Sequence, residues 1–185
     1  MENINFVTCF TGHRNIYGYD YKDIRYVKLI KTLDKYLLEN GFYTEGNIFI
    51  SGGALGFDTL CFKMIDKAAN TYNLENILAI PFERQSIKWN EKDKSVYEDM
   101  KLMADEVVYV DTLDKYRIKT VPIGMYHPAK MQKRNAFMVD NSNVVVSCWN
   151  GKKEKSGTLK CIKYARKKGK KIINIDPYSL EIKEI

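Results

Sequence analysis

The stretch that decides the fold reads NIFISGGALGFD and spans residues 47–58. Its first part, Asn47 to Ile50, is a short apolar run typical of a buried strand, and the glycines that follow it indicate a turn. A helical pattern from Phe57 to Asn70 begins directly after the turn. A strand that passes through glycines into a helix is the repeating unit of parallel sheets with crossover helices. The stretch therefore predicts an α/β fold.

The same order of elements recurs on both sides of this unit. An apolar run from Ile4 to Phe10 predicts the first strand, and apolar residues repeat at helical spacing before Gly41, at Ile24, Val27, Ile30, Leu33 and Leu37. Further along the chain we expect strands over 76–80, 107–110, 144–148 and 171–175 and helices over 91–104, 129–139 and 157–168. The pattern predicts a doubly wound, mainly parallel sheet with helices on both faces, Rossmann-like, in one domain over residues 1–185.

Two segments lie outside this pattern. Residues 111–128 contain two prolines and no clear periodicity, and they are too long for a bare connection. We expect Thr112 to His127 to fold over the site as a lid or to carry a β-hairpin. The tail after Pro177 carries no assignment.

Composition sets the class of protein and of partner. The chain has 185 residues, of which 45% are hydrophobic and 29% charged, as in ordinary globular proteins. Its net charge of +7 favours anionic partners. Ten basic residues against one acid lie between Lys152 and Lys171, and they predict either a solvated helix face or a surface that contacts phosphates. The Lys-, Tyr- and Asn-rich composition is compatible with a low-GC bacterial or phage genome.

The cysteines and the apolar segments bear on location and metals. Cys9, Cys61, Cys148 and Cys161 form no CxxC pair and have no histidine at ligand spacing, so we expect buried thiols and no metal site. No apolar run approaches the roughly 20 residues that span a bilayer, and the N-terminus does not resemble a signal peptide. A cytoplasmic location without a membrane partner is expected.

Polar residues and a glycine follow the first predicted strand. Thr11-Gly12-His13-Arg14 stands at its carboxyl end, where open α/β sheets bind their ligands. Gly12 lets the backbone approach a ligand closely, and the planar guanidinium of Arg14 suits a phosphate or carboxylate. His13 is interpreted either as an orienting hydrogen-bond donor or as a general acid or base.

The glycine-rich turn is the most informative part of the chain. Ser51, Gly52, Gly53 and Gly56 could present backbone N–H groups to an anion at the start of a helix, or could serve only the packing of a tight turn. The turn is neither a Walker A motif nor a GxGxxG fingerprint. Asp58 either caps the helix, holds a ribose hydroxyl or acts in catalysis.

A second turn of this kind is Ser156-Gly157-Thr158, which fits both an anion site and an ordinary helix cap. We expect the two turns to follow neighbouring strands and to converge at one rim of the sheet. If the Gly52 turn and the Gly157 turn lay at opposite ends of the molecule, the site would not exist.

Two further segments supply candidate ligand contacts. Phe82 or Trp89, with the polar Gln85 between them, suits stacking on a base, with plain loop packing as the alternative. Arg134 and Asn135 are adjacent on a predicted helix, and either one would complete an anion clamp if it pointed at the rim.

Five ordered motifs together resemble a known family. They are TGHR at 11–14, SGGALGFD at 51–58, PF..Q...W at 81–89, RN..MVD.S at 134–142 and SGT at 156–158. The chain resembles the YpsA-like branch of the SLOG superfamily, a Rossmann-like group that also contains the Smf/DprA proteins and the LOG phosphoribohydrolases. The resemblance covers nearly the whole chain. It implies a nucleotide pocket built from Gly12, Arg14, Ser51, Gly52, Gly53, Gly56, Asp58, Arg134, Asn135, Gly157 and Thr158.

The resemblance also bears on activity. LOG proteins cleave the N-glycosidic bond of nucleoside 5′-monophosphates with a PGGxGTxxE-type loop. The SGT segment lacks the proline, the doubled glycine and the glutamate of that loop, since Lys160, Cys161 and Ile162 follow Thr158 and Leu159. YpsA-like proteins are linked to bacterial cell division, and SLOG domains broadly resemble sensors or processors of nucleotide signals.

Three functional hypotheses follow. The leading one is a sensor or regulator that binds a nucleotide or nucleotide-derived phosphate ligand, such as an ADP-ribose-like or signalling nucleotide, without a further cofactor. The second is a nucleoside monophosphate glycosidase in which Asp58 or Glu83 assists departure of the base. The third is DprA-like binding of single-stranded nucleic acid through residues 152–171. A homo-oligomer is a further open alternative.

Overall fold

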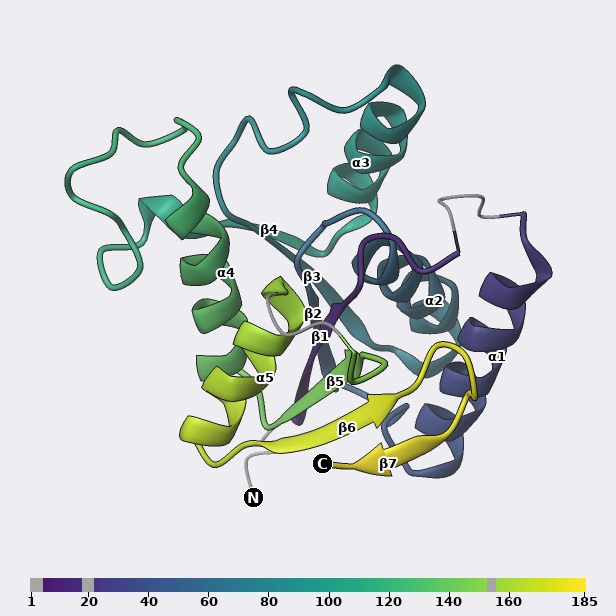
Figure 1. Ribbon diagram of the computed structural model, residues 1–185. Helices are drawn as coiled ribbons and strands as arrows, with labels where there is room; N and C mark the ends of the chain where they lie inside the picture. Colours follow the sequence, from purple (N-terminus) through teal and green to yellow (C-terminus); the bar gives the residue numbers. More distant parts are fainter. Residues whose placement is uncertain (1–4, 18–21, 153–155) are drawn as a thin grey trace.

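The computed structural model describes residues 5–17, 22–152 and 156–185, and within them lies one seven-stranded sheet flanked by helices (Figure 1). The strands are β1 Val7–Gly12, β2 Ile48–Ser51, β3 Glu75–Ile80, β4 Glu106–Tyr109, β5 Val144–Cys148, β6 Lys171–Ile175 and β7 Ile182–Glu184. The helices are α1 Ile24–Glu39, α2 Phe57–Tyr72, α3 Glu91–Met103, α4 Pro128–Asp140 and α5 Gly157–Lys167, with a 3₁₀ turn η1 at Val110–Thr112. None of the described helices is long and apolar enough to cross a membrane.

The order of the strands creates a switch point beside β1. The sheet runs β4-β3-β2-β1-β5-β6-β7, so the chain moves outward from β1 to β4 and then returns to place β5 on the other side of β1. The first six strands are parallel, and β7 pairs antiparallel with β6. A doubly wound α/β fold is therefore confirmed. In such sheets the crevice at the reversal is where ligands bind.

The helices cover both faces of the sheet. In Figure 1, α4 and α5 lie together on one side of the strands and α1 and α2 on the other. Successive residues of β1 point to opposite faces of the sheet. Phe10 packs in the hydrophobic cluster with α1 and α2, whereas Cys9 packs in the cluster with α4 and α5. All four cysteines are buried free thiols, as predicted.

Helix α1 buries a face that only partly matches the predicted one, because Leu33 and Leu37 are buried as expected but Tyr26 and Leu29 are buried in place of Val27 and Ile30. The buried residues are Tyr26, Leu29, Leu33 and Leu37, whereas Ile24 and Val27 are 61% and 38% exposed. The predicted pattern contained only aliphatic residues and so did not include Tyr26. A tyrosine can be buried only where its hydroxyl finds a hydrogen-bond partner. Inside the protein the Tyr26 hydroxyl accepts a hydrogen bond from the Tyr17 backbone N–H at 3.3 Å.

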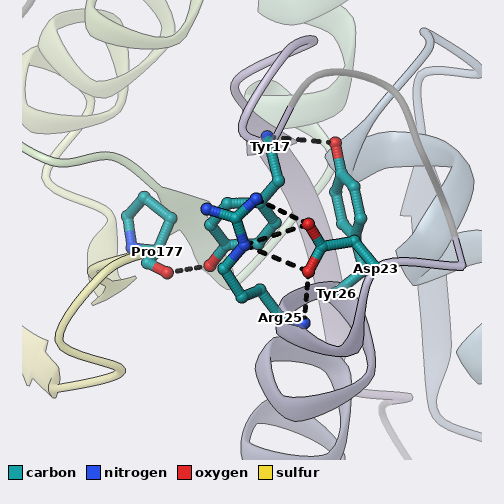
Figure 2. Close-up of polar contacts among 5 residues, drawn as sticks. All are labelled: Tyr17, Asp23, Arg25, Tyr26 and Pro177. Carbon is teal, nitrogen blue, oxygen red and sulfur yellow. Dashed lines mark hydrogen bonds and ion pairs between the residues drawn. The ribbon is translucent and has the colours of Figure 1, made fainter.

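Figure 2 shows how the start of α1 holds the loop after β1 and the C-terminal tail together. The Tyr17 hydroxyl donates a hydrogen bond to the Pro177 carbonyl. The guanidinium of Arg25 lies 4.8 Å from the centre of the Tyr17 ring and pairs with Asp23, which caps the helix. The tail that had no assignment thus forms β7 and anchors the loop.

The segment between η1 and α4 is held down by a buried ion pair. Residues 113–127, all of which are described, contain turns and no strand, so the β-hairpin alternative is wrong. Lys130 of α4 donates from Nζ to Asp111 Oδ2 at 2.7 Å and to the Pro122 carbonyl at 2.8 Å. The Gly124 N–H donates to the same Asp111 oxygen at 2.8 Å. We call residues 113–127 the lid.

Asp140, at the end of α4, joins the lid to α5. Its carboxylate accepts hydrogen bonds from the hydroxyls of Tyr116 and Tyr164, each at 2.9 Å, and pairs with Lys115 and Lys168. Burial by itself would raise the pKa of Asp140, but these four partners outweigh burial and lower the pKa to about 2.

Breaking the buried lid pair should be costly. We expect Lys130→Met to lower the free energy of unfolding by about 3 to 5 kcal/mol, because the Asp111 carboxylate would stay buried without its cation. Urea unfolding measures the change, and Lys133→Met, at an exposed lysine of the same helix, is the matched control. A loss no larger than that of the control would contradict the assigned role.

The Asp140 contacts should make stability depend on pH in a defined window. A folded pKa of about 2, below the ordinary 3.8, means that the contribution is complete above pH 3.8 and is lost as pH falls towards 2. We expect Asp140→Asn to cost about 1 to 2 kcal/mol at about pH 7 and much less near pH 2. Asp114→Asn, at an exposed lid acid, should show no such convergence in urea unfolding.

Candidate functional site

A cavity of about 800 Å³ opens at the carboxyl ends of the central strands, next to the switch point. Its lining comes from the loop after β1, the start of α2, the end of the lid with α4, and the first turn of α5. The volume lies within the range of small-molecule sites, about 300 to 1,000 Å³. The fold thus forms a hollow where the topology predicts one.

Most of the predicted site residues meet in this cavity. Those that line it are Gly12, His13, Arg14, Asp58, Arg134, Asn135, Ser156, Gly157 and Thr158. We had expected the two glycine turns to follow neighbouring strands. The strands that precede them, β2 and β5, are instead separated by β1 and flank it on its two sides. Both turns nevertheless reach the same rim, because parallel strands end on the same edge of the sheet.

The glycine turn after β2 directs its polar groups into the protein. The carboxylate of Asp58 accepts hydrogen bonds from the backbone N–H groups of Gly52 and Ala54. The Gly52 carbonyl accepts one from Arg134, and the Gly53 carbonyl accepts one from the Gln85 side chain at 2.8 Å. The anion that these amides hold in the structure is therefore the Asp58 carboxylate of the chain itself.

Close approach explains two of the glycines. A Cβ on Gly52 would stand 1.6 Å from Arg134 Nη1, and a Cβ on Gly56 would stand 2.1 Å from the Arg14 carbonyl oxygen. Gly56 also has φ +86°, in the left-handed region that side chains disfavour. The turn is shaped around the two arginines that reach the cavity.

Asp58 and Arg134 form a buried ion pair at the cavity wall. Arg134 Nη1 lies 3.6 Å from Asp58 Oδ2, and each residue is 5% exposed. Burial raises the pKa of Asp58, while Arg134, Arg14 and the two backbone N–H groups oppose that rise. Burial lowers the pKa of Arg134, and Asp58 opposes the change. An arginine keeps its proton in proteins, so Arg134 contributes a buried positive charge beside the Asp58 carboxyl group.

The first turn of α5 supplies the other polar wall. The Ser156 hydroxyl caps the helix by accepting the Leu159 N–H at 3.0 Å. The N–H groups of Gly157 and Thr158 have no acceptor among the described residues, and a Cβ on Gly157 would meet nothing within 4 Å. Lys160 lines the same wall and is exposed. This wall can accept an anion directly.

Several predicted residues do not line the cavity. Phe82 is 1% exposed beneath the lid, and Trp89 packs edge-on against Tyr97 with 5.2 Å between ring centres. Gln85 and Ser51 are buried behind the glycine turn, and Glu83 is exposed outside the lining. Gly53 likewise belongs to the turn and not to the lining.

Sequence reasoning did not single out Tyr126, Gln132 or Lys160, which line the cavity. Tyr126 is 60% exposed, and its ring stands edge-on to Phe82 at 5.8 Å. The signal that could have found it is an aromatic residue at the end of a long segment already expected to fold over the site.

The comparisons with known proteins agree with the motifs. The YspA SLOG family model (YpsA) matches residues 8–180. The uncharacterized SPbeta prophage-derived protein YoqJ of Bacillus subtilis (strain 168) is 37% identical over 143 residues, which cover 76% of this chain and 79% of YoqJ.

Two solved structures are also similar. One is DNA processing protein A (DprA) from Streptococcus pneumoniae, with a TM-score of 0.57 and 17% identity, covering 92% of this chain. The chain spans 50% of the length of that DprA chain, and at this identity the likeness concerns the fold alone. The other is TM1055, with a TM-score of 0.46, 17% identity, and coverage of 90% of this chain and 72% of TM1055. Because the family model matches nearly the whole chain and YoqJ supports it, the chain belongs to the YspA SLOG family (YpsA).

Proposed function

We propose that the protein binds a nucleotide or nucleotide-derived phosphate ligand in the cavity at the switch point and acts as a sensor or regulator. The observation that carries the proposal is the convergence of the first turn of α5 with Arg14 and Lys160 on one cavity of about 800 Å³. Such a ligand would be anionic at one end and flat and apolar at the other.

The phosphate fits the wall formed by α5. The N–H groups of Gly157 and Thr158 stand at a helix N-terminus, where the helix dipole favours negative charge. Arg14 and Lys160 add two further cations to the cavity lining. The loop that carries Arg14 is anchored three residues later, at Tyr17 (Figure 2). This anchoring lowers the entropy lost when the loop holds a ligand.

The base fits the side of the cavity closed by the lid. Tyr126 replaces Phe82 and Trp89 as the stacking candidate, because it is the lid aromatic that lines the cavity. Lys88 Nζ lies 5.8 Å from the centre of its ring. The amide side chains of Gln132 and Asn135 line the cavity on α4 and can hydrogen-bond the edge of a base.

Binding without cleavage is favoured over the glycosidase hypothesis. Asp58 is the one carboxylate in the described lining, and it is already held by Arg134 and two backbone N–H groups. A general acid must deliver a proton to the leaving base. Asp58 is only 5% exposed and is enclosed by Arg134 and the glycine turn, so its carboxyl group has little freedom to reach a leaving base. We expect nucleoside monophosphates to be recovered intact after incubation with the protein.

A panel of ligands tests the proposal by thermal unfolding. At a hundredfold excess over its Kd, a bound ligand adds about 2.7 kcal/mol, which raises Tm by roughly 5 to 10 °C for a chain of this size. Nucleoside mono- and diphosphates, ADP-ribose and cyclic dinucleotides form the panel. Lys160→Glu should weaken binding about tenfold or more, because it reverses a charge at the phosphate wall. Lys163→Glu, at an exposed lysine of the same helix outside the lining, should not. If no compound raises Tm, the proposal is wrong.

A second candidate function is binding of single-stranded nucleic acid along α5. Lys160, Lys163 and Lys167 are exposed and spaced so that they share one side of the helix, which leads away from the cavity mouth. No acidic residue lies within α5. Of the ten basic residues between 152 and 171, four lie in α5, and those at 153 and 155 fall outside the described residues.

The two candidates respond differently to the same variants. If single-stranded DNA binds along α5, Lys163→Glu and Lys167→Glu should each weaken binding and make it less sensitive to salt, while leaving the nucleotide response unchanged. Gel shifts over a range of salt concentrations measure this. Absence of binding at low salt would remove this candidate.

A further inference from the structure

The two polar walls of the cavity carry opposite character. The first turn of α5 offers hydrogen-bond donors and Lys160, whereas the first turn of α2 offers the Asp58 carboxylate. Asp58 lines the cavity although it is only 5% exposed. The α5 wall therefore suits a phosphate, whereas the α2 wall presents a hydrogen-bond acceptor beside the buried guanidinium of Arg134.

The Asp58 carboxylate retains room for one more donor. An ionised carboxylate has about four lone-pair sites. The backbone N–H groups of Gly52 and Ala54 take up two of them, and Arg134 Nη1, at 3.6 Å from Oδ2, pairs with the carboxylate without a hydrogen bond. A remaining site suits a neutral donor such as a hydroxyl, because a second cation would have to be buried and a second anion would be repelled.

The placement of both walls in one cavity points to the hydroxyls next to the phosphate. Helix α2 follows β2 and α5 follows β5, and both strands pair with β1, so they are two strand spacings apart, roughly 10 Å. The first turns of both helices line the same cavity, so a ligand whose phosphate contacts α5 can present its ring hydroxyls to Asp58. Tyr126 and the amides of α4 lie on the side left for the base.

We propose that Asp58 accepts a hydrogen bond from the ribose hydroxyls of the ligand and so selects ribonucleotides over deoxyribonucleotides. This inference rests on the proposed function and makes it narrower. The ligand class becomes a ribosyl phosphate with free ring hydroxyls. Asp58 then serves specificity and not cleavage, and Arg134 and the glycine turn hold its carboxylate in place.

Matched ligands test the inference without any variant. The probes are the four ribonucleoside 5′-monophosphates, their 2′-deoxy and 2′,3′-dideoxy counterparts, ribose 5-phosphate and inorganic phosphate, with Kd measured by calorimetry. We expect each ribonucleotide that binds to lose about tenfold or more in affinity when both hydroxyls are removed, since a hydrogen bond to a charged group is lost. Inorganic phosphate should bind more weakly than ribose 5-phosphate.

Asp58→Asn then assigns the preference to this residue. In the variant the preference for ribose should shrink to within a factor of about three, because an amide oxygen accepts the hydroxyl less strongly than a carboxylate. The affinity for inorganic phosphate should hold or rise as a negative charge is removed. Circular dichroism checks that the variant is folded. If Asp58→Asn does not fold, the comparison of matched ligands on the unmodified protein still decides whether ribose is selected.

The outcomes separate the two proposals. Equal affinities for ribose and dideoxyribose forms would overturn the role of Asp58 and leave nucleotide binding intact. A higher affinity of the Asp58→Asn variant for ribonucleotides would also overturn it, because Asp58 would then only repel the ligand. If neither nucleotides, ribose 5-phosphate nor phosphate bind, both proposals fail together.

Discussion

The site depends on one buried contact, that of the Arg134 guanidinium with the Gly52 carbonyl and the Asp58 carboxylate. This contact joins α4 to the turn between β2 and α2. Arg134 and Gly52 are 82 residues apart in the chain. It is possible only because Gly52 has no side chain, since a Cβ there would overlap the guanidinium. Both charges are costly to bury, and each makes the burial of the other tolerable. The contact therefore fixes Asp58 and the glycine turn against α4 at the cavity wall.

The architecture could be predicted from the sequence because its signals are local and repeated. Two strands, β5 and β6, have the bounds that the apolar runs predicted, and glycines mark where β2 ends and where α1 stops. The predictions failed where tertiary contacts decide. The buried face of α1 depends on Tyr26, whose hydroxyl accepts a hydrogen bond from the Tyr17 backbone N–H, and β7 is a three-residue strand that forms by pairing with β6. Neither partner can be recognised in a single segment of sequence.

The candidate site shows the same division. The residues that follow strands, such as Arg14, Asp58 and Gly157, could be placed at one rim from topology alone, and the structure brings them together. What topology does not specify is the direction of each polar group. The amides of the glycine turn face Asp58 and not the open cavity, and Phe82 lies beneath the lid while Tyr126 lies at its surface. These directions follow from packing between segments that are distant in sequence, including the buried Lys130–Asp111 pair that positions the lid.

The bond between the Tyr17 hydroxyl and the Pro177 carbonyl joins the loop after β1 to the opposite end of the described chain (Figure 2). Residues near Pro177 do not line the cavity, yet they hold the segment from which Arg14 extends. Relatives that share every cavity residue can therefore differ in how firmly the Arg14 loop is held, through substitutions in a tail that no inspection of the pocket would single out.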